Sequence, residues 1–336
     1  MQTTYANIKE LGGFYQVSFG VKKVVVLGAG TMGHGIAQVC ARSGYETVMV
    51  DIKPEVLARA LDNIRRELEV FVNRGLINQN DVEDVLSRIS TELSIAKAVR
   101  DADFVIECVV EDLEVKKKVF KEVDENAPFD TIIGTNTSTI SITELAKVTR
   151  RPQMVLGVHF WNPPHLMPLV EIVKTEFTSD KVIEATRKFV ESLEKVPVLC
   201  KEAPGYLGVR LQGAIFLEAV RMLEEGIASA EDIDMAVKMT LGLRYPILGP
   251  LQVADLGGLD VFYLALNYLY SVTKEERFKP PKILKEMVEK GKLGVKTCQG
   301  FYKYTPEQVE KIVKFRDEWL MDQLISRGLL KVKKKE

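Results

Sequence analysis

The stretch Lys22–Leu27 (KKVVVL), continued by Gly28-Ala29-Gly30-Thr31-Met32-Gly33 and then by HGIAQVCARSG, decides the fold of the N-terminal half. The β-branched run predicts a strand buried on both faces of a parallel sheet, and the segment after the glycines has helical apolar spacing. A second strand, ETVMVD, ends at Asp51. This order of strand, GxGxxG, helix, strand and acidic residue predicts a Rossmann-type dinucleotide-binding unit.

Each glycine of the turn has a physical role. Gly28 permits the tight turn, Gly30 lets the backbone approach a pyrophosphate, and Gly33 lets the helix pack closely on the strand. The helix start, with Thr31 and Met32, presents free N–H groups and a positive dipole end to the phosphates. We therefore expect all five residues to contact the cofactor.

Asp51 indicates which dinucleotide binds. Its carboxylate can accept hydrogen bonds from both ribose hydroxyls and would repel a 2′-phosphate, which favours NAD over NADP. Lys53 lies nearby and weakens that preference. A flavin is the alternative cofactor, and a glycine-rich turn without a ligand is the structural alternative.

Composition restricts the class of protein. The chain has 336 residues, long enough for about two domains, and its net charge of −1 provides no basic field for nucleic acid. It lacks an apolar run of about 18 residues or a secretion signal, so we expect no membrane partner. The cysteines are far apart and form no CxxC, so we expect no metal site and free thiols in a reducing cytoplasm.

The sequence predicts an α/β domain with an inserted helical hairpin, followed by an all-α domain. Pro54–Arg74 forms a long amphipathic helix ended by Gly75, and a helix near Asp81–Arg88 returns the chain. From about Pro204 helical spacing dominates. The expected parts are an N-terminal extension (1–20), the Rossmann-type domain (21–203), the helical domain (204–325) and a basic tail (326–336). Further expected elements are strands at Phe104–Val110, Thr131–Gly134, Met154–Phe160 and Leu169–Val173, and helices at Leu113–Glu125 and Val209–Glu225.

A histidine and a glutamate stand on two neighbouring predicted strands. His159 lies near the end of MVLGVHF, and Glu171 lies in the middle of LVEIV, with a proline turn between them. A carboxylate in an apolar strand is costly without a partner, and His159 can provide one. The carboxylate would fix the imidazole tautomer and leave the other ring nitrogen free as a base. A purely structural histidine–glutamate pair is the alternative.

Other residues compete for these roles. His165 is a rival base beside the prolines, and the backbone sets the role of His34 in the nucleotide turn. One of Ser138, Thr139 and Ser141 is expected to cap the helix that follows them.

Five blocks from Val21 to Tyr304, in order GAGTMGHGIA, NTSTI, GVHFWNPPHLMPLVEIV, APGY and GVKTCQGFYKY, resemble the 3-hydroxyacyl-CoA dehydrogenases. The resemblance implies NAD on the first domain and an acyl-CoA substrate between the domains. It also implies a homodimer formed through the helical domain.

Matching motifs imply roles for individual residues. His159 matches the catalytic histidine, Glu171 its partner, Ser138 the substrate-orienting serine, and Asn162 the asparagine near the reacting centre. The resemblance further implies cofactor contacts from Glu111, Lys116 and Lys296, and a CoA phosphate contact from Arg74 on the hairpin.

Two residues depart from the family pattern. Val209 stands where an asparagine is usual, and a valine cannot donate a hydrogen bond to a substrate; Gln212 or a water could compensate. Glu67 stands where some members carry a small hydroxyl residue, and a carboxylate there suits a CoA phosphate poorly. The stretch from Arg210 to Pro250 resembles the branch that includes L-gulonate 3-dehydrogenase and lambda-crystallin.

The sequence therefore predicts NAD-dependent oxidation of the 3-hydroxyl of a short-chain (S)-3-hydroxyacyl-CoA, with His159 as general base. A dehydrogenase of a free 3-hydroxy acid such as L-gulonate is the alternative. A non-enzymatic NAD-binding structural protein is the third possibility.

Overall fold

The computed structural model describes residues 20–331, which divide into two compact units between Ile215 and Phe216. The expected N-terminal extension lies outside the described residues except for Gly20, and so does the basic tail after residue 331. The division lies inside helix α8 (Gly208–Glu224), whereas the expected boundary between residues 203 and 204 precedes that helix. That boundary stays a prediction.

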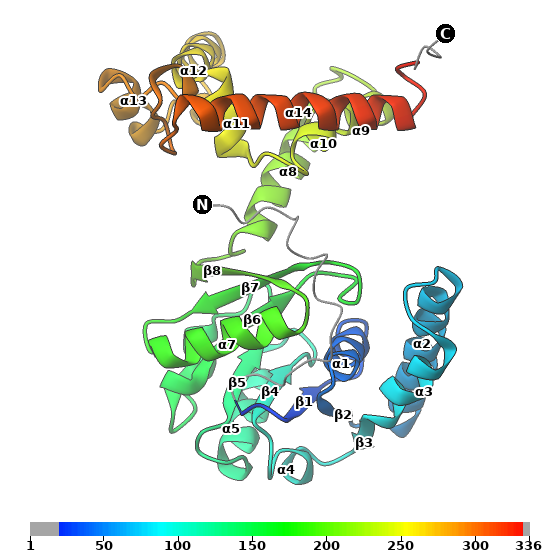
Figure 1. Cartoon of the computed structure of the whole chain (residues 1–336). Coiled ribbons are helices and arrows are strands. Elements are labelled where there is room, and N and C mark those ends of the chain that lie inside the picture. Colours follow the sequence, from blue (N-terminus) through cyan, green and yellow to red (C-terminus); the bar gives the residue numbers. More distant parts are fainter. Residues whose placement is uncertain (1–19, 332–336) are drawn as a thin grey trace. The chain divides into compact units, whose positions relative to one another are not determined.

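The first unit is built on an eight-stranded sheet in the order β3-β2-β1-β4-β5-β6-β7-β8 (Figure 1). Neighbouring strands are parallel except β6 and β7, which are antiparallel. The strands are β1 (Lys23–Leu27), β2 (Glu46–Val50), β3 (Ile89–Glu92), β4 (Phe104–Glu107), β5 (Ile132–Thr135), β6 (Val155–Phe160), β7 (Leu169–Lys174) and β8 (Val196–Lys201).

Helices cover both faces of this sheet and bury an apolar core on each side. One core includes residues of α1 (Gly33–Arg42), the hairpin α2 (Pro54–Asn73) and α3 (Gln79–Ser87), and α7 (Asp180–Ser192). The other includes residues of α4 (Ile95–Ala98), α5 (Leu113–Asn126) and α6 (Ile142–Ala146). Two-sided burial explains why the central strands read as continuous apolar runs. The predicted Rossmann-type α/β architecture is confirmed.

The inserted hairpin forms because its first helix has one apolar stripe. Leu57, Ala60, Ile64, Leu68 and Phe71 recur every three or four residues along α2, and all are buried. The fixed φ of a proline suits the first helical position, which Pro54 occupies. The chain leaves the helix through Gly75, whose φ of +69° lies in the left-handed region.

One predicted strand is shorter than expected. The apolar run Phe104–Val110 predicts a strand along its whole length, but β4 ends at Glu107. The Glu107 side chain accepts a hydrogen bond from the backbone N–H of Val109 (2.7 Å), which turns the chain out of the sheet.

The second unit, beyond Ile215, contains no strand within its described residues. It continues α8 and adds α9 (Ala230–Met239), α10 (Leu241–Arg244), α11 (Pro250–Gly257), α12 (Leu259–Thr273), α13 (Lys282–Glu289) and α14 (Pro306–Ser326). Short 3₁₀ turns lie at Glu276–Phe278 and Val295–Thr297. The predicted helical second domain is confirmed.

A buried carboxylate holds the GFYKY segment to α11. Asp255 accepts hydrogen bonds from the backbone N–H groups of Phe301 (2.9 Å) and Tyr302 (3.0 Å) and from the Tyr304 hydroxyl (2.9 Å). A Cβ at Gly300 would lie 2.0 Å from an Asp255 oxygen, so only glycine fits there. A Cβ at Gly294 would lie 2.1 Å from the backbone oxygen of Asp255, so both glycines of GVKTCQGFYKY are needed for this close contact.

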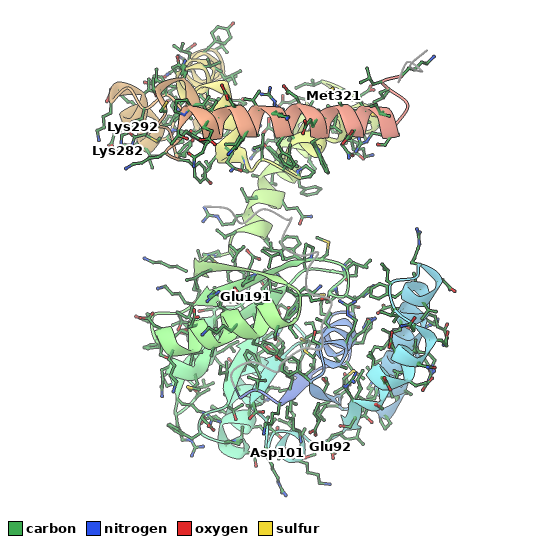
Figure 2. The ribbon with its side chains drawn as sticks, in the orientation of Figure 1. Glu92, Asp101, Glu191, Lys282, Lys292 and Met321 are labelled. Atoms are coloured by element: carbon green, nitrogen blue, oxygen red, sulfur yellow. The ribbon has the colours of Figure 1, made fainter. Side chains whose placement is uncertain are left out.

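Helix α14 and its neighbours carry many exposed side chains, among them Met321 (Figure 2). No helix within residues 20–331 is long and apolar enough to cross a membrane.

Candidate active site

The antiparallel pairing of β6 and β7 places His159 directly opposite Glu171. His159 Nδ1 lies 2.7 Å from Glu171 Oε2, and Glu171 is fully buried. Since an ionised carboxylate only accepts hydrogen bonds, Nδ1 must carry the proton and Nε2 is left free to act as a base.

Three further donors stabilise the charge on Glu171. The backbone N–H groups of Leu207 (3.0 Å) and Gly208 (2.9 Å) donate to its Oε1, and the Trp161 indole N–H lies 3.3 Å from its Oε2. Burial acts to raise the pKa of Glu171, but the hydrogen bonds from His159 and the two amides outweigh it, so the pKa is lowered. Glu171 is therefore ionised at neutral pH.

Two aromatic rings hold the imidazole in place. The rings of Trp161 and Tyr206 lie edge-on to His159, with centroids 5.8 and 5.7 Å away. Tyr206 has a φ of +45°, a strained conformation for a non-glycine residue that aims its ring at the histidine. The His159 side chain keeps 9 % of its surface accessible, enough for one ring nitrogen to meet a ligand.

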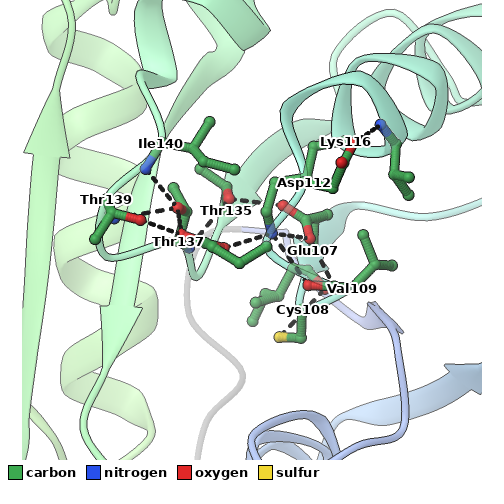
Figure 3. A network of polar contacts seen from close by, with 12 residues as sticks. Glu107, Cys108, Val109, Asp112, Lys116, Thr135, Thr137, Thr139 and Ile140 are labelled. Atoms are coloured by element: carbon green, nitrogen blue, oxygen red, sulfur yellow. Dashed lines mark hydrogen bonds and ion pairs between the residues drawn. The ribbon is translucent and has the colours of Figure 1, made fainter.

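A polar network at the ends of β4 and β5 shapes the loop that follows β5 (Figure 3). Buried Glu107 accepts from the Lys116 ammonium (2.6 Å) and from the Thr135 hydroxyl (2.7 Å). Burial raises the pKa of Glu107, while Lys116 and the hydrogen bonds act to lower it. The Lys116 ammonium also lies 3.3 Å from the Glu111 carboxylate. Because the Lys116 side chain is only 1 % exposed, its charge stabilises Glu111 inside the protein.

Glu111 connects this network to the predicted substrate-orienting serine. It accepts hydrogen bonds from the hydroxyls of Thr137 and Thr139, and Thr137 Oγ1 accepts in turn from the backbone N–H of Ile140 (3.0 Å). Burial acts to raise the pKa of Glu111, but the Thr137 hydrogen bond and the Lys116 charge outweigh it and lower the pKa. The loop is thereby folded around Ser138.

Ser138 is half-buried, and within residues 20–331 its hydroxyl has no hydrogen-bond partner, which leaves it available to a ligand. Ser141, by contrast, accepts from the backbone N–H of Glu144 and caps α6. This confirms the predicted helix cap.

Asparagines lie on two loops at this edge of the sheet. Asn162 is exposed in the turn between β6 and β7. Asn136 Oδ1 accepts from the backbone N–H of Phe160 (2.8 Å) and ties the end of β5 to the end of β6. The sequence analysis did not single out Asn136, although it lies in the NTSTI block.

The glycine turn fits a pyrophosphate. A Cβ at Gly33 would lie 1.7 Å from the carbonyl oxygen of Gly28, whereas a Cβ at Gly30 would meet nothing within 4 Å. In the described part of the chain, the backbone N–H groups of Gly30, Thr31 and Met32 have no acceptor. Free amides on an open glycine turn before a helix are the donors that a dinucleotide requires.

Asp51 lies at the end of β2 beside this turn. Its Oδ2 accepts from the backbone N–H of Ala29 (3.0 Å), and its Oδ1 lies 3.4 Å from the backbone nitrogen of Lys53. The carboxylate is thus oriented by the turn and remains partly exposed for a ribose.

The remaining predicted residues lie elsewhere. Arg74 is exposed at the C-terminal end of α2. Lys296 belongs to the second unit and pairs with Asp260 at 2.5 Å. His165 faces Glu67 at 3.3 Å and is not part of the pair formed by His159 and Glu171. Val209 follows Gly208 in the first turn of α8.

Within residues 20–331, no group of three or more histidine, cysteine, aspartate or glutamate side chains is arranged to hold a metal ion. All four cysteines are free thiols.

The first unit combines a Rossmann-type fold with a histidine that is hydrogen-bonded to a buried glutamate near the C-terminal ends of the strands. This combination is typical of an NAD-dependent dehydrogenase that acts on a hydroxyl group. Residues 23–203 match the family model of the 3-hydroxyacyl-CoA dehydrogenase NAD-binding domain, and residues 205–304 match that of its C-terminal domain. The chain belongs to the 3-hydroxyacyl-CoA dehydrogenase family.

Individual relatives agree with this assignment. The chain is 41 % identical over 290 residues to the mitochondrial hydroxyacyl-coenzyme A dehydrogenase of Sus scrofa, covering 84 % of this chain and 91 % of the relative. It is 38 % identical over 282 residues to the 3-hydroxybutyryl-CoA dehydrogenase of Clostridioides difficile, covering 84 % and 99 %. The crystal structure of a 3-hydroxyacyl-CoA dehydrogenase from Archaeoglobus fulgidus superposes with a TM-score of 0.77 at 40 % identity, covering 92 % and 100 %.

Family membership confirms the predicted resemblance, the NAD-binding domain and the class of enzyme. The roles of individual site residues stay predictions.

Replacing Asp51 tests how the site selects its cofactor. Asp51→Ser removes the charge that would repel a 2′-phosphate, so we expect weaker NADH binding and a smaller difference between NADH and NADPH. Fluorescence titration with both cofactors measures this. Asp62→Ser, an exposed aspartate on α2, is the matched control. An unchanged NADH-to-NADPH affinity ratio in Asp51→Ser would remove Asp51 from the ribose site.

Proposed function

We propose that the protein catalyses NAD-dependent oxidation of the 3-hydroxyl of short-chain (S)-3-hydroxyacyl-CoA to the 3-oxoacyl-CoA. The observation that carries the proposal is the buried pair of His159 and Glu171 at 2.7 Å. The names of the relatives, 3-hydroxybutyryl-CoA dehydrogenase among them, support a short acyl chain.

His159 is the base in the proposed mechanism. Its Nε2 takes the proton of the substrate hydroxyl, and Glu171 stabilises the imidazolium that forms. Bound NAD would accept the hydride from the carbon that bears the hydroxyl. The free amides of Gly30, Thr31 and Met32 would hold its pyrophosphate.

Other residues orient the reactants. The Ser138 hydroxyl, which has no partner among the described residues, can donate to the substrate oxygen, and exposed Asn162 lies in the loop that follows His159. Glu111, fixed by Thr137 and Lys116, would contact the cofactor, and Arg74 on the hairpin would hold a CoA phosphate. A cofactor contact from Lys296 belongs to the same proposal.

A free 3-hydroxy acid such as L-gulonate is the second candidate substrate. Val209 favours it, because this position offers no hydrogen-bond donor to a thioester carbonyl. Glu67 also favours it, since a carboxylate on the hairpin would repel a CoA phosphate.

We also propose that the protein is a homodimer that associates through its second unit. Few apolar side chains in that unit are buried, whereas Leu264 is 66 % exposed, Tyr268 67 % and Val272 59 % along α12 alone. A helix that is apolar around most of its circumference requires cover, and a second copy would provide it. Four free thiols support a reducing compartment, and we propose the cytoplasm.

Steady-state NADH formation tests the substrate. We expect kcat/KM for (S)-3-hydroxybutyryl-CoA to exceed that for L-gulonate and for free 3-hydroxybutyrate by at least about a hundredfold, or ~2.7 kcal/mol. His159→Ala should lower kcat by roughly 10²- to 10⁴-fold and leave NADH affinity nearly unchanged, since the histidine acts on the hydroxyl proton.

Preference for a free acid would contradict the acyl-CoA assignment and make Val209 and Glu67 determinants of specificity. Full activity of His159→Ala would exclude His159 as the base. Tight NADH binding with no turnover on any of the three substrates would favour a non-enzymatic protein.

Light scattering coupled to size exclusion tests the dimer. The protein should elute with twice the mass of one chain, and Leu264→Glu should shift it toward the monomer because a charge would be buried at the interface. Leu93→Glu, an equally drastic change at a 52 % exposed leucine of the first unit, is the control. A monomeric wild-type protein would contradict this proposal.

A further inference from the structure

Three side chains meet outside the His159–Glu171 pair, and each comes from a different element of the first unit. They are His34 of α1, Glu67 of α2 and His165 of the β6–β7 loop. His34 Nε2 lies 3.2 Å from Glu67 Oε1, and His165 Nδ1 lies 3.3 Å from Glu67 Oε2. The second contact is within ion-pair distance but off the hydrogen-bond direction. The side chains are mostly buried, with 12 % of each histidine and 25 % of the glutamate exposed.

His34 connects Glu67 to the glycine turn. His34 Nδ1 lies 2.8 Å from the carbonyl oxygen of Gly30, so both ring nitrogens of His34 face oxygens that accept hydrogen bonds. The His34 ring therefore bridges the glycine turn and the Glu67 carboxylate.

His165 is the neutral member of the cluster. Burial lowers the pKa of His165; Glu67 acts to raise it, while the positive groups His34, Lys195 and Arg42 lower it further. One carboxylate thus contacts both imidazoles, with one oxygen facing each ring.

The cluster joins two functional segments. At one end, Gly30 belongs to the glycine turn whose amides, without an acceptor among residues 20–331, would hold a pyrophosphate. At the other end, His165 belongs to the loop 161–168, which carries Asn162 and begins at Trp161, a donor to Glu171. Successive contacts therefore lead from the Gly30 carbonyl through His34 and Glu67 to His165, in the loop that follows the catalytic histidine.

The loop 161–168 is also held by contacts other than the one between His165 and Glu67. Lys195 Nζ donates to the carbonyl oxygens of Pro164 (2.7 Å) and Met167 (2.8 Å). Pro164 packs against α1, because a Cβ at Gly35 would lie 3.1 Å from its ring. The loop thus contacts α1 directly, the β8 side through Lys195, and α2 through Glu67.

We propose that Glu67 is a positioning residue that, through His34 and His165, couples the glycine turn to the loop 161–168, so that dinucleotide binding orders the loop that carries Asn162. The consequence for catalysis rests on the proposed role of Asn162, whereas the coupling itself rests only on the NAD-binding domain. Glu67 acts through its neighbours and touches neither the reacting atoms nor, in this proposal, the cofactor.

Hydrogen–deuterium exchange of the full chain, with and without saturating NADH, tests this coupling without requiring turnover. The readout is the peptide containing the backbone N–H groups of Leu166 and Met167, which donate to the carbonyl oxygen of Pro163. In the wild type, NADH should slow their exchange about fivefold, the effect of roughly one hydrogen bond.

Four variants sharpen the test. Glu67→Leu keeps a helix-forming residue but removes the carboxylate that contacts both histidines. His165→Leu removes only the contact between Glu67 and the loop 161–168. Both variants should abolish the NADH-induced slowing of exchange. Glu67→Gln keeps the length and shape of the side chain and can still accept a hydrogen bond from His34, so it should restore most of the effect. Glu69→Leu, at an exposed position of the same helix, should behave as the wild type.

NADH fluorescence titration of each variant ensures that the cofactor site is saturated. The proposal is overturned if NADH leaves loop exchange unchanged in the wild type, or if Glu67→Leu retains the wild-type slowing. The exchange experiment contains no substrate, so its outcome does not depend on which substrate the enzyme uses. A preference for a free acid in the kinetic assay would not contradict the proposed coupling. Absence of the coupling would not contradict the proposed substrate.

Discussion

The charge on Glu171 is the constraint on which the active site depends. An ionised carboxylate inside a sheet loses several kcal/mol of solvation, and its neighbours must replace that stabilisation with well-aligned donors. Its donors come from β6 (His159), from the loop after it (Trp161) and from the start of α8 (Leu207 and Gly208). The catalytic histidine, the loop and the first turn of α8 are therefore positioned by one group.

The reversal of direction between β6 and β7 makes this arrangement possible. In an otherwise parallel sheet, the short proline-containing turn returns the chain antiparallel and sets His159 against Glu171 in register. A slip of one residue would move Glu171 to the other face of the sheet, so the register is strongly specified. The same turn carries Asn162 and sets His165 against Glu67, so one loop connects the pair of His159 and Glu171 with the cluster around Glu67.

Sequence reasoning predicted the features that leave a local pattern. The glycine turn with Asp51, the buried central strands and the pairing of His159 with Glu171 each follow from residue types at fixed spacing. Strand β8 (VPVLCK) was not predicted because Pro197 interrupts its apolar residues, as is tolerated only in an edge strand such as this half-exposed one. The donors Leu207 and Gly208 are backbone amides, which carry no side-chain signal. The residues that contact Glu67, His34 and His165, are distant from it in the sequence. From the sequence, Glu67 could therefore be described only as a departure from the family pattern.

Glu171 fixes the tautomer of His159, with the proton on Nδ1 and Nε2 left free as the base. Nitrogen NMR of histidine-labelled protein measures this directly, because the chain has only three histidines and His159→Gln identifies the signal of interest. In the neutral ring we expect a protonated Nδ1 and an unprotonated Nε2, and a loss of this preference in Glu171→Gln. A neutral His159 that carries its proton on Nε2 in the wild type would rule out this role of Glu171.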